Sequence, residues 1–360
     1  MRTVERLSAR WRSLSRAQRV VAALLVALAL LLAVLLPVVA GRSPTPSGAP
    51  PPAAPPPAAP PSSVPPSSAP ASPGGAVSPL TGLPGEAGRI LAVKIDNIVN
   101  ARPQTGLGAA DVVYAIEVEG GLSRFLAVYD ANHLPPGDRI GPVRSARESD
   151  LPILQQYGKV DFAYSGAQTR FLPVLAGADL FNCSPAQDDS FFRGRWDVPP
   201  FNQYVVPSGI LRHFPDAAAA RDVGFRFGPA PAGGVPADTL TARMPAASFT
   251  FTWSPGEGRY LVSIDGKPAG TTDSGRLGAP TVVVQKVAET TSPLRLRDSS
   301  GDLLPYAPTV GGGEAVVLRD GRAYPGTWSR PDAASGTAFS YAGQPMTFHP
   351  GQVWIVLEPR

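Results

Sequence analysis

The segment from residue 44 to residue 79 constrains the fold of this chain more than any other feature. It contains 15 prolines among Ala, Ser, Thr, Val and Gly, with no charged and no aromatic side chain. Such a composition cannot bury a hydrophobic core. Extended polyproline at about 3.1 Å per residue would span on the order of 100 Å. We therefore expect a disordered Pro-rich linker at 44–79 and a folded body in the roughly 280 residues that follow.

An apolar run precedes this linker. Residues 20–40 are interrupted only by Pro37, and a helix of this length crosses a hydrocarbon core of about 30 Å. Six arginines precede the run and only Arg42 follows it closely, so residues 1–19 should be a cytoplasmic basic segment. We expect a transmembrane helix at 20–40, a location in the cell membrane and an extracytoplasmic body.

The alternative to this anchor is a signal peptide. Val38-Val39-Ala40 offers small residues suited to cleavage, which would give a secreted protein. We favour the anchor because the run is longer than the apolar core of about 7–15 residues usual in signal peptides. No cysteine lies near the end of the run, so we do not expect attachment through a lipid-modified N-terminal cysteine.

The positive charge of the chain is concentrated before the body. The first 43 residues hold seven arginines against Glu5 alone, so the overall net charge of +4 leaves −2 for the rest. No Lys/Arg stripe with interleaved aromatic residues follows residue 43. We therefore expect no nucleic-acid partner.

Motifs of familiar enzymes and metal sites are missing from the sequence. Cys183 is the only cysteine, and we expect it to be an inert, buried thiol. His133, His213 and His349 lie in different regions without a ligand spacing such as HxxxH. No GxSxG, P-loop or dinucleotide fingerprint occurs. We expect no metal, no cofactor and, on balance, no enzymatic activity.

Residues 80–228 predict a mixed α/β domain. Residues 89–96 form a mostly apolar run typical of a buried strand, and 111–119 and 122–130 flank Gly120-Gly121, which predicts a hairpin with a two-residue turn. That turn would pair Glu117 with Arg124. Both faces of the sheet are then apolar, so helices should cover both. The candidate helices are 149–157, 169–176 and 208–223, the last as one helix or a pair of short ones, with a further strand at 160–165.

Residues 246–360 contain short runs in which apolar and polar residues alternate. This pattern predicts a small antiparallel all-β domain. Asp265-Gly266 and Asp320-Gly321 are tight-turn signals. Trp253, Trp328 and Trp354 favour a buried core, with a carbohydrate-stacking platform as the alternative. The expected strands are 249–253, 260–264, 281–287, 314–318 and 353–357.

Six motifs in the first domain occur in an order that resembles the YerB-like family. The resemblance covers roughly residues 79–360, and Thr281 to Lys286, Gly326 to Trp328 and Pro350 to Trp354 extend it to the C-terminal domain. It implies a bacterial extracytoplasmic protein, commonly a lipoprotein, with two domains of unknown function. Two departures are the missing lipoprotein cysteine and Phe201, where the family is expected to have histidine. The motifs are Pro79 to Pro84, Val93 to Asn97, Ala101 to Leu107, Ala110 to Tyr114, Val118 to Phe125 and Ile140 to Arg147.

Arginine and carboxylate residues form the richest polar set of the chain. We expect Arg144 and Arg147 to open a helix and to share one of its faces. With backbone donors at the helix start, such a group could bind a phosphate or a carboxylate bidentately. The alternative is a structural network of salt bridges with Glu117, Glu119, Glu148 and Asp150. The candidate anion-binding residues are Arg102, Arg124, Arg144 and Arg147, with Asp96, Asn97, Glu117 and Glu119 as an accompanying polar cluster.

Three functional hypotheses follow. The first is a non-catalytic envelope protein that binds an anionic wall precursor, a wall polymer or a membrane-bound wall enzyme. The second is a hydrolase or transferase on an anionic wall substrate, with Asp96, Glu117 or Glu119 as base and the arginines as a charge clamp. The third is a purely structural envelope tether.

Overall fold

The computed structural model describes residues 75–195 and 198–360, which belong to a single compact unit. The expected basic segment at 1–19, the apolar run at 20–40 and the linker up to residue 74 lie outside the described residues. Within the described part of the chain, no helix has the length and apolar character needed to cross a membrane.

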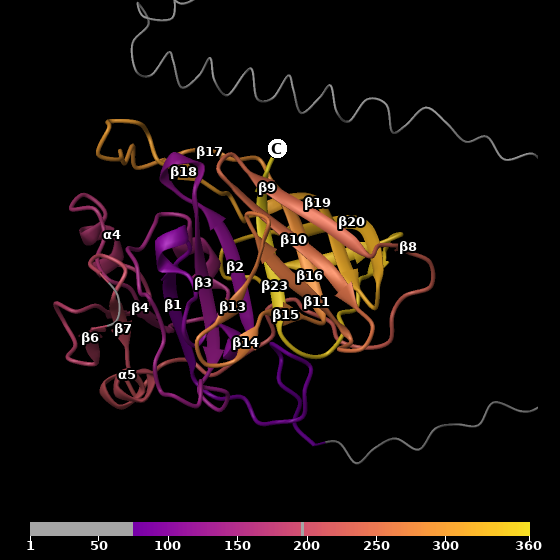
Figure 1. Ribbon diagram of the computed structural model, residues 1–360, viewed down its shortest axis with the longest axis horizontal. Coiled ribbons are helices and arrows are strands. Elements are labelled where there is room, and N and C mark those ends of the chain that lie inside the picture. The colour runs from indigo at the N-terminus through magenta and orange to yellow at the C-terminus, as the bar shows by residue number, and fades with distance from the viewer. Residues whose placement is uncertain (1–74, 196–197) are drawn as a thin grey trace, which may run out of the picture. The chain divides into compact units, whose positions relative to one another are not determined.

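A twelve-stranded mixed sheet runs through the body (Figure 1). Its strands are β1 (Ile90–Asp96), β2 (Val112–Glu117), β3 (Ser123–Asp130), β4 (Asp161–Ala163), β5 (Phe181–Cys183), β8 (Val235–Pro236), β16 (Thr281–Val287), β19 (Gly311–Arg319), β20 (Arg322–Arg330), β21 (Ala338–Tyr341), β22 (Gln344–Pro345) and β23 (Val353–Pro359). The order is β22-β21-β20-β19-β16-β23-β2-β3-β1-β4-β5, and β8 pairs with β20.

A smaller five-stranded antiparallel sheet packs on the large one. It consists of β9 (Thr239–Met244), β10 (Ala247–Ser254), β11 (Arg259–Ile264), β12 (Lys267–Pro268) and β15 (Gly278–Ala279). Three two-stranded ribbons are formed by β6 (Phe191–Arg193) with β7 (Gln203–Val205), β13 (Gly270–Thr271) with β14 (Gly275–Arg276), and β17 (Thr290–Thr291) with β18 (Pro305–Tyr306).

The helices of the described body are short. They are α3 (Asp150–Gln155), α4 (Leu172–Ala176) and α5 (Pro207–His213), with 3-10 turns η2 (Val99–Ala101), η3 (Leu107–Ala109) and η4 (Glu119–Gly121). The first two confirm the helices expected at 149–157 and 169–176. The helix expected at 208–223 ends at His213, because Phe214 precedes a proline and therefore avoids the helical region (φ −122°, ψ 69°).

The two faces of the large sheet pack against different partners. On one face, Ala92 and Leu126 belong to the same core as Ile153 and Leu154 of α3. On the other face, the core contains side chains of the small sheet and Ile210 of α5. The expectation that helices cover both faces is therefore only partly confirmed, because the small sheet supplies most of the cover on the second face. The β9–β11 strands are themselves apolar on alternate residues, so a second sheet can serve as that cover.

Two of the three tryptophans expected in a core or a platform are buried in the core. Trp354 is inaccessible to solvent and makes edge contacts with Phe125 and Phe251, at ring-centroid distances of 5.5 and 6.2 Å. Trp328 is 4% exposed, and its indole N–H donates to the Lys286 carbonyl at 2.9 Å. These contacts overturn the carbohydrate-platform alternative.

The C-terminal region completes the large sheet. Strand β23 lies between β16 and β2 and is parallel to both, with Val353 opposite Thr281 on one side and Val112 on the other. The prediction of a purely antiparallel C-terminal domain is therefore wrong at this strand. The long excursion between β16 and β23 allows the chain to return in the same direction, which a tight hairpin cannot do.

The β2–β3 hairpin has a longer turn than the sequence predicted. Glu119, Gly120 and Gly121 form a three-residue loop, closed by the Val118 N–H donating to the Leu122 carbonyl at 2.8 Å. Ile116, not Glu117, then stands opposite Arg124. Because a slip of one residue exchanges the faces of a strand, Arg124 leaves the face of Glu117 and joins that of Asp96, its partner on β1.

Candidate functional site

The corner where β1 leaves the sheet organises a buried polar cluster. Asp96 and Asn97 are each 1% exposed. The Asp96 carboxylate accepts the Asn97 N–H at 2.9 Å, and the Asn97 side-chain amide donates to Ser123 Oγ at 2.9 Å. Gln104 donates to the Asp96 carbonyl and to Asn97 Oδ1, both at 3.1 Å. These hydrogen bonds connect Asp96, Asn97, Gln104 and Ser123, and such a network favours one arrangement.

Arg102 connects this corner to the small sheet. Its Nε donates to the Asn97 carbonyl at 2.9 Å, and its Nη2 donates to Asp265 Oδ2 at 2.8 Å. Asp265 belongs to the turn between β11 and β12, where φ is +52° and Gly266 follows at +74°. The tight turn expected at Asp265-Gly266 is thus confirmed, and it aims a carboxylate at Arg102.

Arg124 and Arg147 share one carboxylate. Arg124 Nη2 donates to Glu119 Oε1 at 2.9 Å, and Arg147 donates to both oxygens of Glu119, the Nε bond measuring 2.8 Å. Both arginines also donate to the Ser145 carbonyl. The side chains of Arg124 and Arg147 are 7% and 11% exposed, so these two cations act mainly in a structural ion-pair network.

The electrostatics of this network follow from its burial. Burial alone would raise the pKa of Glu119, but the Arg147 hydrogen bond and both arginine charges lower that pKa to about 2. Burial, together with the charge of Arg147, lowers the pKa of Arg124 to about 10. Lys94 and Asp150, both fully buried, form a neighbouring pair at 2.6 Å, and burial lowers the pKa of Lys94.

Of these arginines, Arg144 makes the fewest side-chain hydrogen bonds. Its Nε lies 2.9 Å from Asp96 Oδ2, but the two atoms are not aligned for a hydrogen bond. Its guanidinium lies over the ring of Phe201, with its central carbon 5.8 Å from the ring centroid. Its two terminal amino groups make no hydrogen bond to any residue in the described ranges, and the side chain is 26% exposed.

The structure corrects two expectations about this set. Arg144 and Arg147 do not open a helix, because α3 begins only at Asp150 and both arginines lie in the irregular segment before it. Glu117 lies apart from the arginines, next to Glu289. Burial and this second carboxylate raise the pKa of Glu117 to about 8. Glu148, another expected partner, instead accepts hydrogen bonds from Ser292 and Leu294.

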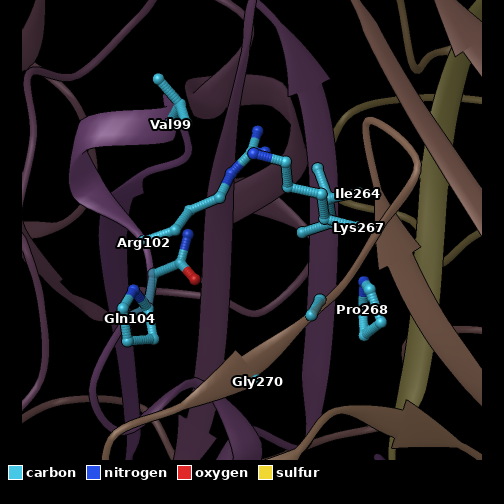
Figure 2. A pocket seen from close by; sticks show the side chains of 9 residues that line it. Val99, Arg102, Gln104, Ile264, Lys267, Pro268 and Gly270 are labelled. Atoms are coloured by element: carbon cyan, nitrogen blue, oxygen red, sulfur yellow. The ribbon is translucent and has the colours of Figure 1, made fainter.

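Two hollows have Arg102 in their lining. The first, here called the Lys267 hollow, has a volume of about 290 Å³ and is lined by Val99, Arg102, Pro103, Gln104, Ile264, Lys267, Pro268, Ala269 and Gly270. In Figure 2, Arg102 and Lys267 extend toward each other from opposite walls. The second, the Leu122 hollow, has a volume of about 350 Å³ and is lined by Asn97, Ile98, Val99, Arg102, Leu122, Ser123, Ala246, Ala247 and Asp265.

Sequence reasoning missed the residues that the small sheet contributes. The sequence indicated Asp265 only as part of a tight turn and did not single out Lys267. The approach of both residues to Arg102 depends on the packing of two sheets. Gln104 stands in the motif that also contains Arg102, and that proximity was the available signal. The sequence also did not predict that His213 lies near Asp188 and Asp189. One potential metal-ligand atom from each of these three residues lies within 4.8 Å of the other two.

The fold and the site together define a β-rich two-domain protein with a buried ion-pair network and two adjoining hollows. Two profiles of one family of unknown function match the chain: the DUF3048 N-terminal domain over residues 80–221 and the DUF3048 C-terminal domain over residues 240–355. The chain therefore belongs to this family, the YerB-like family that its motifs indicate.

One relative and one solved structure illustrate the likeness. YerB of Bacillus subtilis (strain 168), which is named as a candidate lipoprotein, is 35% identical over 134 residues, or 36% of this chain and 39% of YerB. The matched stretch thus spans well under half of that relative. The crystal structure of the Bacillus subtilis YerB protein is similar with a TM-score of 0.66 and 21% identity, covering 79% of this chain and 97% of that one. That similarity concerns the fold.

Proposed function

We propose that this chain is a non-catalytic cell-envelope protein whose extracytoplasmic body binds an anionic component of the cell wall, either a precursor or a polymer. The apolar run at 20–40 and the arginines before it support a membrane anchor. The naming of the relative YerB as a candidate lipoprotein agrees with a place at the envelope. A membrane-bound wall enzyme that presents an anionic surface is an alternative partner for the same site.

One observation carries the binding proposal: the Lys267 hollow holds a cation without a counter-charge. Arg102 is balanced by Asp265, but Lys267 has no ion pair with any residue in the described ranges. Arg102 Nη1 also makes no hydrogen bond within those ranges. An anion in the hollow would therefore meet an ammonium and a guanidinium donor held in place by Asn97 and Asp265.

Calorimetric titration of the full chain in lipid nanodiscs tests this proposal, with pyrophosphate and a glycerol-phosphate oligomer as probes. Lys267→Ala should weaken binding about tenfold, since a hydrogen bond to a charged group contributes about 1.5–3 kcal/mol. Lys159→Ala is the matched control, because it removes an exposed lysine that lies over Phe181, away from the hollow. Equal affinities of the two variants, or no binding by the parent, would leave the structural tether as the better account.

The enzymatic alternative has one observation in its favour. Glu117, with a pKa of about 8, would be a protonated acid at neutral pH. However, neither hollow beside Arg102 is lined by Glu117, and Asp96 and Glu119 are both engaged by arginines. The non-catalytic function therefore accounts for more of the site.

The proposed orientation of the chain across the membrane can be tested separately. Protease added to intact, wall-stripped cells should digest the chain after residue 43 and leave the N-terminal arginine segment protected. A body that resists protease on intact cells but is cut after lysis would refute the extracytoplasmic location.

A further inference from the structure

The two hollows beside Arg102 have complementary linings that say more about the ligand. They share Val99 and Arg102 as lining residues, so the two hollows adjoin. The Lys267 hollow supplies the unbalanced positive charge. The Leu122 hollow contributes apolar walls from Ile98, Leu122 and two alanines.

Large apolar side chains are exposed at this junction. Val99 is 63% exposed, and Leu122 is 38% exposed. They belong to different segments, one in η2 after β1 and the other just before β3, and both face the Leu122 hollow. Exposed apolar side chains gathered at a hollow and bordered by polar groups are typical of binding sites.

We infer that the anionic ligand is a single-chain amphiphile, with a phosphate or carboxylate head between Arg102 and Lys267 and an apolar chain that runs over Val99 into the Leu122 hollow. This inference rests on the proposed function and narrows its ligand class. A head group alone would leave Val99 and Leu122 in water. An uncharged amphiphile would leave Lys267 without a counter-charge. A molecule with an anionic head and an apolar chain both balances the charge of Lys267 and covers Val99 and Leu122.

The chain length and the head group can be varied separately to test this. The full chain in lipid nanodiscs is titrated with ethyl phosphate, hexyl phosphate, hexanoate and hexyl glucoside, and nanodiscs without protein serve as the blank for partition into the bilayer. Hexyl phosphate should bind at least about tenfold more tightly than ethyl phosphate, because each buried methylene contributes about 0.8 kcal/mol. Hexyl glucoside should give no binding above the blank.

Two variants locate the chain and the head. Val99→Ser should weaken hexyl phosphate while leaving ethyl phosphate unchanged, and Lys267→Ala should weaken both. Val235→Ser is the matched control, because Val235 is 54% exposed on β8, outside both hollows. Hexanoate in place of hexyl phosphate tells whether a carboxylate head suffices.

The outcomes separate this inference from the proposed function. Equal affinity for ethyl and hexyl phosphate, both lost in Lys267→Ala, would refute the amphiphile and leave the anion site standing. Equal binding of hexyl glucoside and hexyl phosphate would refute the charged head and with it the proposed function. An effect of Val235→Ser as large as that of Val99→Ser would place the chain elsewhere.

Discussion

Arginines that the sequence groups together have different roles in the folded protein. Arg147 is 11% exposed and forms a two-bond pair with Glu119, whereas Arg144 is 26% exposed and touches Asp96 without an aligned hydrogen bond. Arg147→Ala should therefore lower the free energy of unfolding by about 3 kcal/mol, near the value for breaking a buried pair. Arg144→Ala should lower it by about 1 kcal/mol. Denaturant unfolding of both variants measures the difference.

The pH dependence checks the same pair. The Glu119 pKa is lowered to about 2 from its ordinary value of 4.5, so the stability from this carboxylate is present above pH 4.5 and is lost as pH falls toward 2. The difference in the free energy of unfolding between the parent and Arg147→Ala should shrink as the pH falls over that range. A gap that is constant with pH, or equal losses in the two arginine variants, would contradict the assignment of Arg147 to Glu119.

Glu117 titrates in the opposite sense. Its pKa is raised from 4.5 to about 8, so the protonated acid is the form that fits the fold. The stabilising proton is fully bound below pH 4.5, and its contribution is lost as pH rises toward 8. The thermal midpoint of the parent should therefore fall relative to that of Glu117→Gln between about pH 5 and 8 and then level off. Parallel midpoints across that range would show that Glu117 is not held in the protonated state.

How far the residues of the site could be foreseen depends on sequence distance. Asp96, Asn97, Arg102 and Gln104 lie within nine positions of one another, so their meeting at one corner follows from the end of one strand. Lys267 is more than 160 positions away from Arg102, and only the packing of the small sheet brings it to the hollow. The composition of the motifs held no information about that contact.

At the scale of elements, the β2–β3 turn determines which side chains meet. Gly120 and Gly121 have φ angles of +71° and +67°, a region that other residues adopt at a cost. A Cβ at Gly120 would meet nothing within 4 Å, whereas one at Gly121 would lie 2.6 Å from Pro245 Cβ and 3.0 Å from the Ala246 backbone nitrogen. The glycine pair predicted a turn correctly, but it could not tell a two-residue loop from a three-residue loop.

Alanine substitutions distinguish the two glycines. Gly120→Ala should cost about 1 kcal/mol of unfolding free energy, from the positive φ alone. Gly121→Ala should cost clearly more, because Pro245 and Ala246 of the β9–β10 turn must shift as well. Chemical denaturation of the two variants gives the comparison. If Gly120→Ala proved the more damaging, the loop would not pack on the small sheet as described.

Strand positions were the most predictable elements of the fold. The runs expected at 249–253, 260–264, 281–287, 314–318 and 353–357 all lie in strands, because alternating or continuous apolar runs bounded by Gly and Asp are strong local signals. Strand partners were not predictable in the same way. Nothing local to residues 353–357 indicates that this strand inserts between β16 and β2.

At the scale of the whole molecule, that insertion couples the two halves of the body. The sequence predicted that residues 246–360 fold as an independent domain. In the structure, β23 contributes Trp354 and Val356 to a core shared with Phe125 and Ala115 of the first half. Residues 246–360 alone should therefore lack a cooperative unfolding transition, since one edge of β23 and this core face would be exposed.

Differential scanning calorimetry of the fragment and of the full chain measures this coupling. The fragment should show no sharp heat-absorption peak under conditions in which the full chain does. A sharp peak from the fragment would show that the small sheet and β16–β23 suffice for a core, which is the outcome that the sequence predicted.

The central claim is that the body retains an anionic amphiphile beside Lys267. Its most direct test is purification of the full chain from its own host cells in three forms, parent, Lys267→Ala and Lys159→Ala, followed by mass spectrometry of bound small molecules and proteins. The account predicts an anionic, chain-bearing molecule that accompanies the parent and Lys159→Ala and is lost from Lys267→Ala. The same set of bound molecules in all three preparations would contradict it.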